Sequence, residues 1–361
     1  MKIKIFLSAA FLILFVSYSF AQKETTLKVS KGGNLNVSLS VGDVKITTWD
    51  KAELTAKSEE DDHQDFEISQ SGNTVNINSS SYSLGTDLKI SLPAQFNIKV
   101  NTLGGDIKVT GAVKGEVVLS TSGGDIKTGE VNGMINLKTS GGDIRTGDIT
   151  GDAEVSTAGG DITIGKISGK ASVKTSGGTI TMGSIGGAAD IWTAGGNVNV
   201  KDIGRDAKIK TGGGNIDADK INGQAIIKTG GGNIDLVGAA GYIDAETGAG
   251  NINIKNGAGK FKATTGAGDI YIHLSSDIKG NSELRTGTGS IILYVPADAK
   301  VTINAIVKSF GWGENESGIV SDFPASGKGR NHSQQSYDIN GGGPVINIYA
   351  ALGSIQIKKI K

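Results

Sequence analysis

A column of aspartates, one in each repeat, is the feature of this sequence most suited to chemistry. The residues recur at intervals of 19 and then 18 positions within a Gly-Gly-Asp-Ile motif: Asp106, Asp125, Asp143 and Asp161. Neighbouring strands of a sheet lie about 4.8 Å apart, so carboxylates stacked at that spacing repel one another unless something neutralises them. Calcium is the usual neutralising ion in glycine-rich β-rolls, which makes a calcium site the first hypothesis.

The sequence also supplies counter-charges beside this column. Two positions further on, Lys108, Lys127 and Arg145 accompany the first three aspartates. Where the aspartate column turns to asparagine, the second column turns acidic, at Asp217 and Asp235. Opposite charges placed side by side on one face favour ion pairing over calcium binding. We therefore predict no metal site and no cofactor.

Two neutral polar columns follow the same period. Asparagines continue the aspartate column at Asn197, Asn215, Asn233 and Asn251. An amide ladder at the turns is the simpler interpretation of these residues, and sugar binding is the alternative. Threonines precede the Gly-Gly turns from Thr102 to Thr286, with no base paired to them in any repeat. Their hydroxyls therefore predict packing and hydrogen bonding, not nucleophilic catalysis.

The sequence shows no arrangement typical of an enzyme. His63, His273 and His332 are far apart and share no repeat position. The acidic residues of the repeats are in register or scattered, whereas a lyase or glycosidase cleft needs an isolated pair flanked by arginine and aromatic residues. We predict a protein without catalytic residues. A polysaccharide-active β-helix enzyme is the alternative, because several such enzymes share this architecture.

Aromatic residues are scarce and mark the candidate ligand-binding surface. Trp192 lies in an outward column between Lys174 and Lys210. It is either a stacking platform for a sugar or peptide, or a ring that covers lysine stems. The other candidates lie in a Gly/Asn/Ser-rich segment near the C-terminus: Trp312, Arg330 and Tyr337. That segment is either a binding loop or a cap over the last coil.

The elements that position these columns are short strands. Apolar residues recur every 18 positions, for example at Ile144, Ile162 and Ile180, and they alternate with polar residues inside each short run. Period-two alternation is typical of β-strands, and a fixed short repeat is typical of one unit stacked on itself. The sequence predicts an all-β, single-stranded parallel β-helix with 18-residue coils, capped at both ends. Parallel crossovers are overwhelmingly right-handed, so we expect a right-handed solenoid.

The period and composition also divide the chain. Lys2 and Lys4, an apolar run and Ser19-Phe20-Ala21 predict a signal peptide over residues 1–21. Residues 22–101 form an N-terminal β cap with irregular first coils, and residues 102–295 form the regular solenoid. Residues 296–361 form a last coil and cap that carry a long loop over 308–343.

The composition of the chain excludes several kinds of chemistry and of partner. The chain has no cysteine, which excludes disulfides and a thiol nucleophile. Its 36 basic and 36 acidic residues balance, so we expect no nucleic-acid binding. No second apolar segment could span a bilayer, so we expect no integral membrane segment once the signal peptide is removed.

Several motifs together resemble a known family. They are the repeated Thr-x-Gly-Gly-Asp-Ile, the early Val41-Gly42-Asp43-Val44, Leu92-Pro93-Ala94 before the first full repeat, and the late Ser321-Asp322-Phe323-Pro324. In these features the chain is similar to the bacterial "putative adhesin" β-strand-repeat family, a domain family of unknown function. The resemblance implies a right-handed β-solenoid in the cell envelope or on the cell surface, and it carries over no catalytic residues.

These observations lead to one functional hypothesis and two alternatives. We expect a non-enzymatic, exported β-solenoid that acts as an interaction surface, as an adhesin does, in the periplasm or at the cell surface. Its partner would be a glycan or an envelope or surface protein. The alternatives are a periplasmic ligand-sensing or envelope-stress scaffold and the polysaccharide-active enzyme named above.

Overall fold

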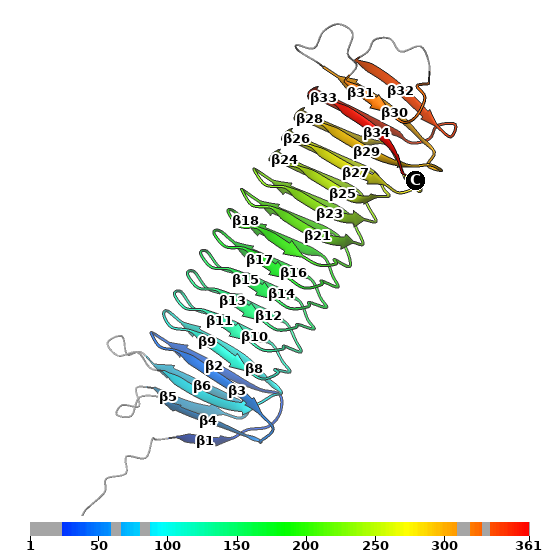
Figure 1. The fold of residues 1–361 in the computed structure, drawn as a ribbon. Helices are drawn as coiled ribbons and strands as arrows, with labels where there is room; N and C mark the ends of the chain where they lie inside the picture. The colour runs from blue at the N-terminus through cyan, green and yellow to red at the C-terminus, as the bar shows by residue number, and fades with distance from the viewer. Residues whose placement is uncertain (1–23, 59–65, 80–86, 309–317, 327–332, 361) are drawn as a thin grey trace, which may run out of the picture.

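The protein is a rod built of β-strands (Figure 1). The structure, a computed structural model, describes residues 24–58, 66–79, 87–308, 318–326 and 333–360. Every regular element in these ranges is a strand, and none is a helix. The chain alternates between two sheets, sheet A and sheet B, as it winds along the rod. The predicted all-β solenoid is confirmed, while the predicted signal peptide lies outside the described residues.

Each regular coil contributes one strand to each sheet. Sheet A receives β9 (Ile107–Thr110), β11 (Ile126–Thr128), β13 (Ile144–Thr146), β15 (Ile162–Ile164), β17 (Ile180–Met182), β19 (Val198–Val200), β21 (Ile216–Ile221), β23 (Ile234–Ala239), β25 (Ile252–Gly257), β27 (Ile270–Leu274) and β29 (Ile291–Pro296). Sheet B receives β8 (Phe96–Thr102), β10 (Val117–Ser120), β12 (Ile135–Lys138), β14 (Ala153–Ser156), β16 (Ala171–Thr175), β18 (Ala189–Thr193), β20 (Ala207–Thr211), β22 (Ala225–Thr229), β24 (Ile243–Ala249), β26 (Phe261–Ala267) and β28 (Ser282–Thr288). Neighbours are parallel and in register, so that Ile162 lies between Ile144 and Ile180.

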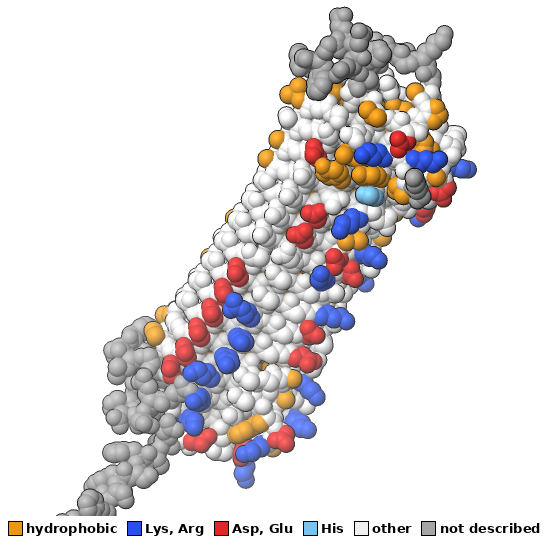
Figure 2. All heavy atoms as spheres, viewed as in Figure 1, with side chains coloured by type: hydrophobic (Ala, Val, Ile, Leu, Met, Phe, Trp, Pro, Cys, Tyr) orange, Lys and Arg blue, Asp and Glu red, His pale blue; other side chains and the backbone are white. Residues whose placement is uncertain are grey.

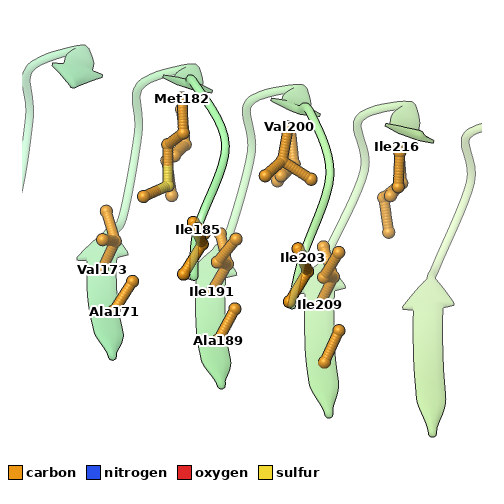
Figure 3. Close-up of a cluster of buried hydrophobic side chains, with 14 of the residues drawn as sticks. Ala171, Val173, Met182, Ile185, Ala189, Ile191, Val200, Ile203, Ile209 and Ile216 are labelled. Carbon is orange, nitrogen blue, oxygen red and sulfur yellow. The ribbon is translucent and has the colours of Figure 1, made fainter. Parts of the chain in front are cut away.

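The interior of the rod is a stack of matching apolar layers (Figure 3). Residues alternate between buried and solvent-facing along each strand, as in β18, where Ala189, Ile191 and Thr193 are buried and the two residues between them are exposed. A third row of single parallel bridges closes the coil between the two sheets: Val113, Val131, Ile149, Ile167, Ile185, Ile203 and Ile221. Because β-branched side chains pack well on a pleated surface, stacked isoleucine and valine hold successive coils in register.

The second glycine of each Gly-Gly turn is required by the close approach of successive turns. A Cβ atom built on Gly160 would lie 2.1 Å from the carbonyl oxygen of Gly142, one coil away. That oxygen belongs to backbone and cannot move aside without moving its own turn. The repeated glycine is therefore a packing requirement of the stack.

At the N-terminal end, spatial order departs from chain order. The strands are β1 (Thr25–Lys28), β2 (Gly33–Leu39), β3 (Val44–Trp49), β4 (Glu53–Ser58), β5 (Glu67–Ser71), β6 (Thr74–Ser79) and β7 (Leu88–Pro93). The coil of β2 and β3 is inserted between two later ones, with β2 between β6 and β8 and β3 between β7 and β9. Antiparallel β5 then covers β6, and β4 followed by β1 covers β7.

The C-terminal end repeats this insertion. Its strands are β30 (Val301–Val307), β31 (Ile319–Ser321), β32 (Gln334–Ile339), β33 (Val345–Leu352) and β34 (Ile355–Ile360). The last coil in sequence lies between two earlier ones, with β33 between β28 and β30 and β34 between β29 and β31. Two of these strands, β31 and β32, fall within residues 308–343, which the sequence predicted as a long loop. They form because β34 and β30 would otherwise present open sheet edges.

Both sheets are open in the described part of the chain. Each contains 17 strands in a single line of pairings. Sheet A ends at β1 and β31, and sheet B ends at β5 and β32. The antiparallel edge strands distinguish the ends from the parallel middle.

Candidate functional site

The aspartate column forms a hydrogen-bond ladder with the backbone of the next coil. Asp106 Oδ1 accepts from the amide N–H of Asp125 at 2.8 Å, and Asp125 Oδ1 accepts from that of Asp143 at 2.7 Å. Asparagines continue the ladder with the same geometry, since Asn197 Oδ1 accepts from the amide of Asn215 at 2.8 Å. The asparagine column thus forms a ladder, but its hydrogen bonds run from side chain to backbone and not from amide to amide, and the carboxylates share it. Aspartate and asparagine are interchangeable here because both present an oxygen at the same place.

The ladder also accounts for stacked carboxylates without a metal ion. One oxygen of each ladder carboxylate faces an N–H dipole, which offsets part of the repulsion between neighbours. No group of three or more metal-ligating side chains occurs among the residues that the structure describes. The predicted ion pairing is present at one position, where Arg145 Nη2 lies 2.8 Å from Asp143 Oδ2. Lys108 and Lys127, by contrast, form no such pair in the described residues.

Further along the same face, the second column is acidic. Asp217 and Asp235 are direct neighbours on β21 and β23. Burial and the Asp235 carboxylate both raise the pKa of Asp217, and Lys255 opposes the shift. Asn253 Nδ2 donates to Asp235 Oδ1 at 3.0 Å. The charge pattern noted in the sequence therefore lies on one continuous outer face of sheet A, with its basic part towards the N-terminus (Figure 2).

The threonine column is buried and joins the turns. Thr157 Oγ1 donates to the carbonyl of Gly142 in the preceding coil at 2.9 Å and accepts from the amide of Gly160 in its own turn at 3.3 Å. Both bonds repeat from Thr121 to Thr229, and the donation to the preceding coil continues to Thr286. This use of the hydroxyls is structural, as the sequence predicted.

The outer face of sheet B is hollowed by a groove of about 710 Å³ that crosses several coils. The groove lies where the first inward residue of the strand is alanine: Ala153, Ala171, Ala189 and Ala207. The coil before this run carries the larger Ile135 at that position, and Ala225 continues the run up to the larger Ile243. The methyl group of alanine fills less space at the start of the strand than a larger side chain does, so the surface is lower there. The run of alanines was visible in the sequence, and it is the signal that could have located the groove.

The charged residues lining the groove are mainly acidic. Five carboxylates and two lysines contribute: Glu116, Asp152, Glu154, Asp190, Asp206, Lys170 and Lys208. Asp152 Oδ1 and Asp206 Oδ1 also accept backbone N–H groups of the next coil, each at 2.8 Å. Met134 adds an exposed apolar side chain. The groove thus offers both polar and apolar contacts to a ligand that lies along the rod.

Trp192 stands beside this groove. It faces outward from β18, two residues after Asp190, and its neighbours on β16 and β20 are Lys174 and Lys210. Its side chain is 39% exposed, and it makes no hydrogen bond or ring contact within the described residues. Trp49 is different: its Nε1 donates to the Glu53 carbonyl at 2.9 Å. The indole of Trp192 is therefore free to meet a ligand.

The other predicted surface residues do not join Trp192. Trp312 and Arg330 lie outside the described residues. Tyr337 is 2% exposed and packs in the C-terminal core, so its prediction as a surface residue was wrong. Burial raises the pKa of Tyr337. The ring belongs to the cap because it sits on β32, whose inward residues cover the last coils.

The histidines do not converge on a site either. His273 faces outward on β27 and stacks on Tyr294, with ring centroids 4.1 Å apart. His63 and His332 lie outside the described residues. In the described part of the chain, no helix is long and apolar enough to cross a membrane.

The fold and these faces define a class of protein, a capped β-solenoid with long exposed surfaces. Residues 2–165, somewhat less than half of the 361-residue chain, match the model of the family described as Toastrack DUF4097. This match agrees with the resemblance to a β-strand-repeat family of unknown function.

Comparison with solved structures returns proteins described in similar terms. One is a "putative cell adhesion protein" from Clostridium sporogenes ATCC 15579, with 12% identity, 94% of this chain and 100% of that chain covered, and a TM-score of 0.17. Another is a "putative adhesin" from Bacteroides fragilis NCTC 9343, with 13% identity, coverage of 95% and 98%, and a TM-score of 0.25. No curated protein matches the chain.

Proposed function

We propose that this protein is an exported, non-enzymatic interaction rod of the bacterial cell envelope that works as an adhesin. The outer face of sheet B binds the ligand, which is an extended glycan or a segment of an envelope or surface protein. Trp192 carries this proposal, because a large exposed indole without internal partners lies beside a groove that follows the rod. Aromatic residues of this kind dominate binding energies when a partner covers them.

The groove supports an extended ligand over a compact one. It crosses coils from Glu116 to Ile226, and neighbouring coils are about 4.8 Å apart, so its length is about 25–30 Å. A linear polymer could contact several coils at once through similar groups in each. The stacked coils present such groups in fixed register.

The proposed export and the proposed non-enzymatic role rest on different observations. Export rests on the basic, apolar and small-residue pattern of residues 1–21. A non-enzymatic role is supported by the use of the in-register side chains, since ladder carboxylates and threonine hydroxyls bond to the backbone. Incubation with common polysaccharides tests this point: new reducing ends or unsaturated products would contradict it.

The ligand-binding proposal is tested with the purified mature chain on a glycan array and on immobilised envelope fractions. Trp192→Ala should weaken binding about thirtyfold, because truncating a central tryptophan typically costs about 2 kcal/mol. Leu103→Ala is the control, since Leu103 is 59% exposed in the turn after β8 and does not line the groove. Leu103→Ala should bind as the wild type does. Unchanged binding by Trp192→Ala, or equal losses in both variants, would contradict the proposal.

A further inference from the structure

The outer face of sheet A carries two rows of opposite charge that run along the N-terminal half of the rod (Figure 2). In spatial order the acidic row is Asp87, Asp43, Asp106, Asp125, Asp143 and Asp161. The basic row lies two residues further along the same strands and consists of Lys89, Lys45, Lys108, Lys127 and Arg145. Five successive coils thus present the same acid–base pair.

Each row has the same axial repeat, about 4.8 Å from one coil to the next. Like charges at that spacing repel along the row, and the repulsion is relieved when opposite charges approach. Asp143 and Arg145 pair within one strand, but Lys108 and Lys127 have no ion-pair partner in the described residues. Asp106 and Asp125 use Oδ1 in the ladder, which leaves Oδ2 to face solvent. A trough of about 260 Å³ is lined by residues of both rows.

A partner that neutralises both rows must present opposite charges at the same repeat. A second copy of this chain does so. Consider two copies face to face, related by a twofold axis that runs parallel to the rod. The rotation exchanges the left and right rows, so the acidic row of each copy meets the basic row of the other.

We propose that sheet A mediates association of two copies of this chain, side by side and parallel, through these rows. The rest of the face is compatible with the arrangement. Asp217 would meet Asn215 of the second copy and Asp235 would meet Asn233, so like charges do not face each other in these coils. The neutral coils between the two charged regions would pair Thr181 with Thr179 and Asn199 with Asn197.

The pattern also selects one orientation. With rods antiparallel and the same coils facing, the acidic row would meet the acidic row and the basic row the basic row. Like charges placed directly opposite disfavour association. In this arrangement the two sheet B faces point in opposite directions, one on each side of the pair. Such a pair could engage two ligand segments at once, and its avidity would exceed that of a single rod.

The test is sedimentation velocity of the mature chain at about 20 mM and about 500 mM NaCl, because exposed charge pairs are screened by salt. A dimer should form at low salt and dissociate at high salt. Asp106→Asn with Asp125→Asn should weaken dimerisation at least about tenfold, since four pairs across the twofold interface are lost. Asparagine keeps the ladder intact, as it does at Asn215 and Asn233.

Two further samples make the result specific. Asp148→Asn with Asp202→Asn is the matched control, because it removes two ladder charges from another edge of the rod and should leave dimerisation unchanged. Lys108→Gln with Lys127→Gln should weaken self-association as the aspartate variant does, and mixing the two variants should restore part of it. A monomer at every salt concentration, or a dimer that both variants leave unchanged, would overturn the proposal. Binding to the ligand of sheet B is measured separately and does not depend on this outcome.

Discussion

The middle of the rod and its two ends are built by different rules. From β10 to β27, each strand pairs with the strand one coil earlier and one coil later, so chain order is also stacking order. At each end a terminal coil is inserted between two coils that follow one another in sequence. The middle uses parallel pairs throughout, whereas the ends add the antiparallel strands β4, β5 and β32.

The difference shows what each region must specify. A coil of the middle needs only to match the coil beside it, and every coil offers nearly the same apolar columns. An end has to stop the stack, because an open edge would pair with another chain. Insertion of the terminal coil ties the chain terminus into both sheets. The coils of the middle are thus interchangeable with one another, whereas the coils at the ends are not.

The largest expected effect comes from comparing two deletions of similar length, one at the C-terminal end and one in the middle of the rod. Removal of residues 345–361 takes away β33 and β34, including the fully buried Ile346 and Ile355. The flanking strands lose their partners, so we expect the C-terminal end to lose more than about 5 kcal/mol of local stability. Deletion of residues 162–179 removes one whole coil and joins Asp161 to Ile180 in register. We expect the shorter rod to remain folded.

Hydrogen exchange of both deletion variants measures the result coil by coil. Fast exchange should appear in β28 to β31 of the C-terminal deletion, and the internal deletion should keep its protection. Equal loss of protection in both variants would show that the middle is as specific as the ends.

Within the middle, inward and outward positions should differ strongly. Ile162 is 0% exposed, so Ile162→Ala should cost about 2–5 kcal/mol of unfolding free energy through the cavity that it leaves. Lys174 faces solvent on β16, the strand that follows in sequence. Lys174→Ala should therefore cost less than about 0.5 kcal/mol of unfolding free energy. Denaturant unfolding followed by circular dichroism compares the two variants. Similar losses would mean that the columns are not divided into core and surface as described.

The same contrast explains how much of the fold could be read from the sequence. Isoleucine columns such as Ile144, Ile162 and Ile180 repeat at a fixed interval, so their inward direction and parallel stacking were predictable. The inserted coils were not, because no repeat interval encodes the pairing of β2 with β8 or of β28 with β33. Contacts between segments more than 60 residues apart leave no periodic signal.

The candidate sites were predictable to a smaller extent. The position of Trp192 between two lysines followed directly from the period. The ladder role of Asp106 was missed because the neighbouring lysines suggested ion pairs, whereas its nearest donor is a backbone amide. Tyr337 was misplaced because the cap breaks the repeat, which leaves no column to show that it points inward.

The most direct test of the proposed adhesin role is protease accessibility of the native protein on intact cells, compared with cells whose envelopes are permeabilised. The proposed function predicts cleavage on intact cells, since a rod that binds external ligands through sheet B must be exposed at the surface. Protection until permeabilisation would contradict adhesion and would direct the search for ligands to the periplasm.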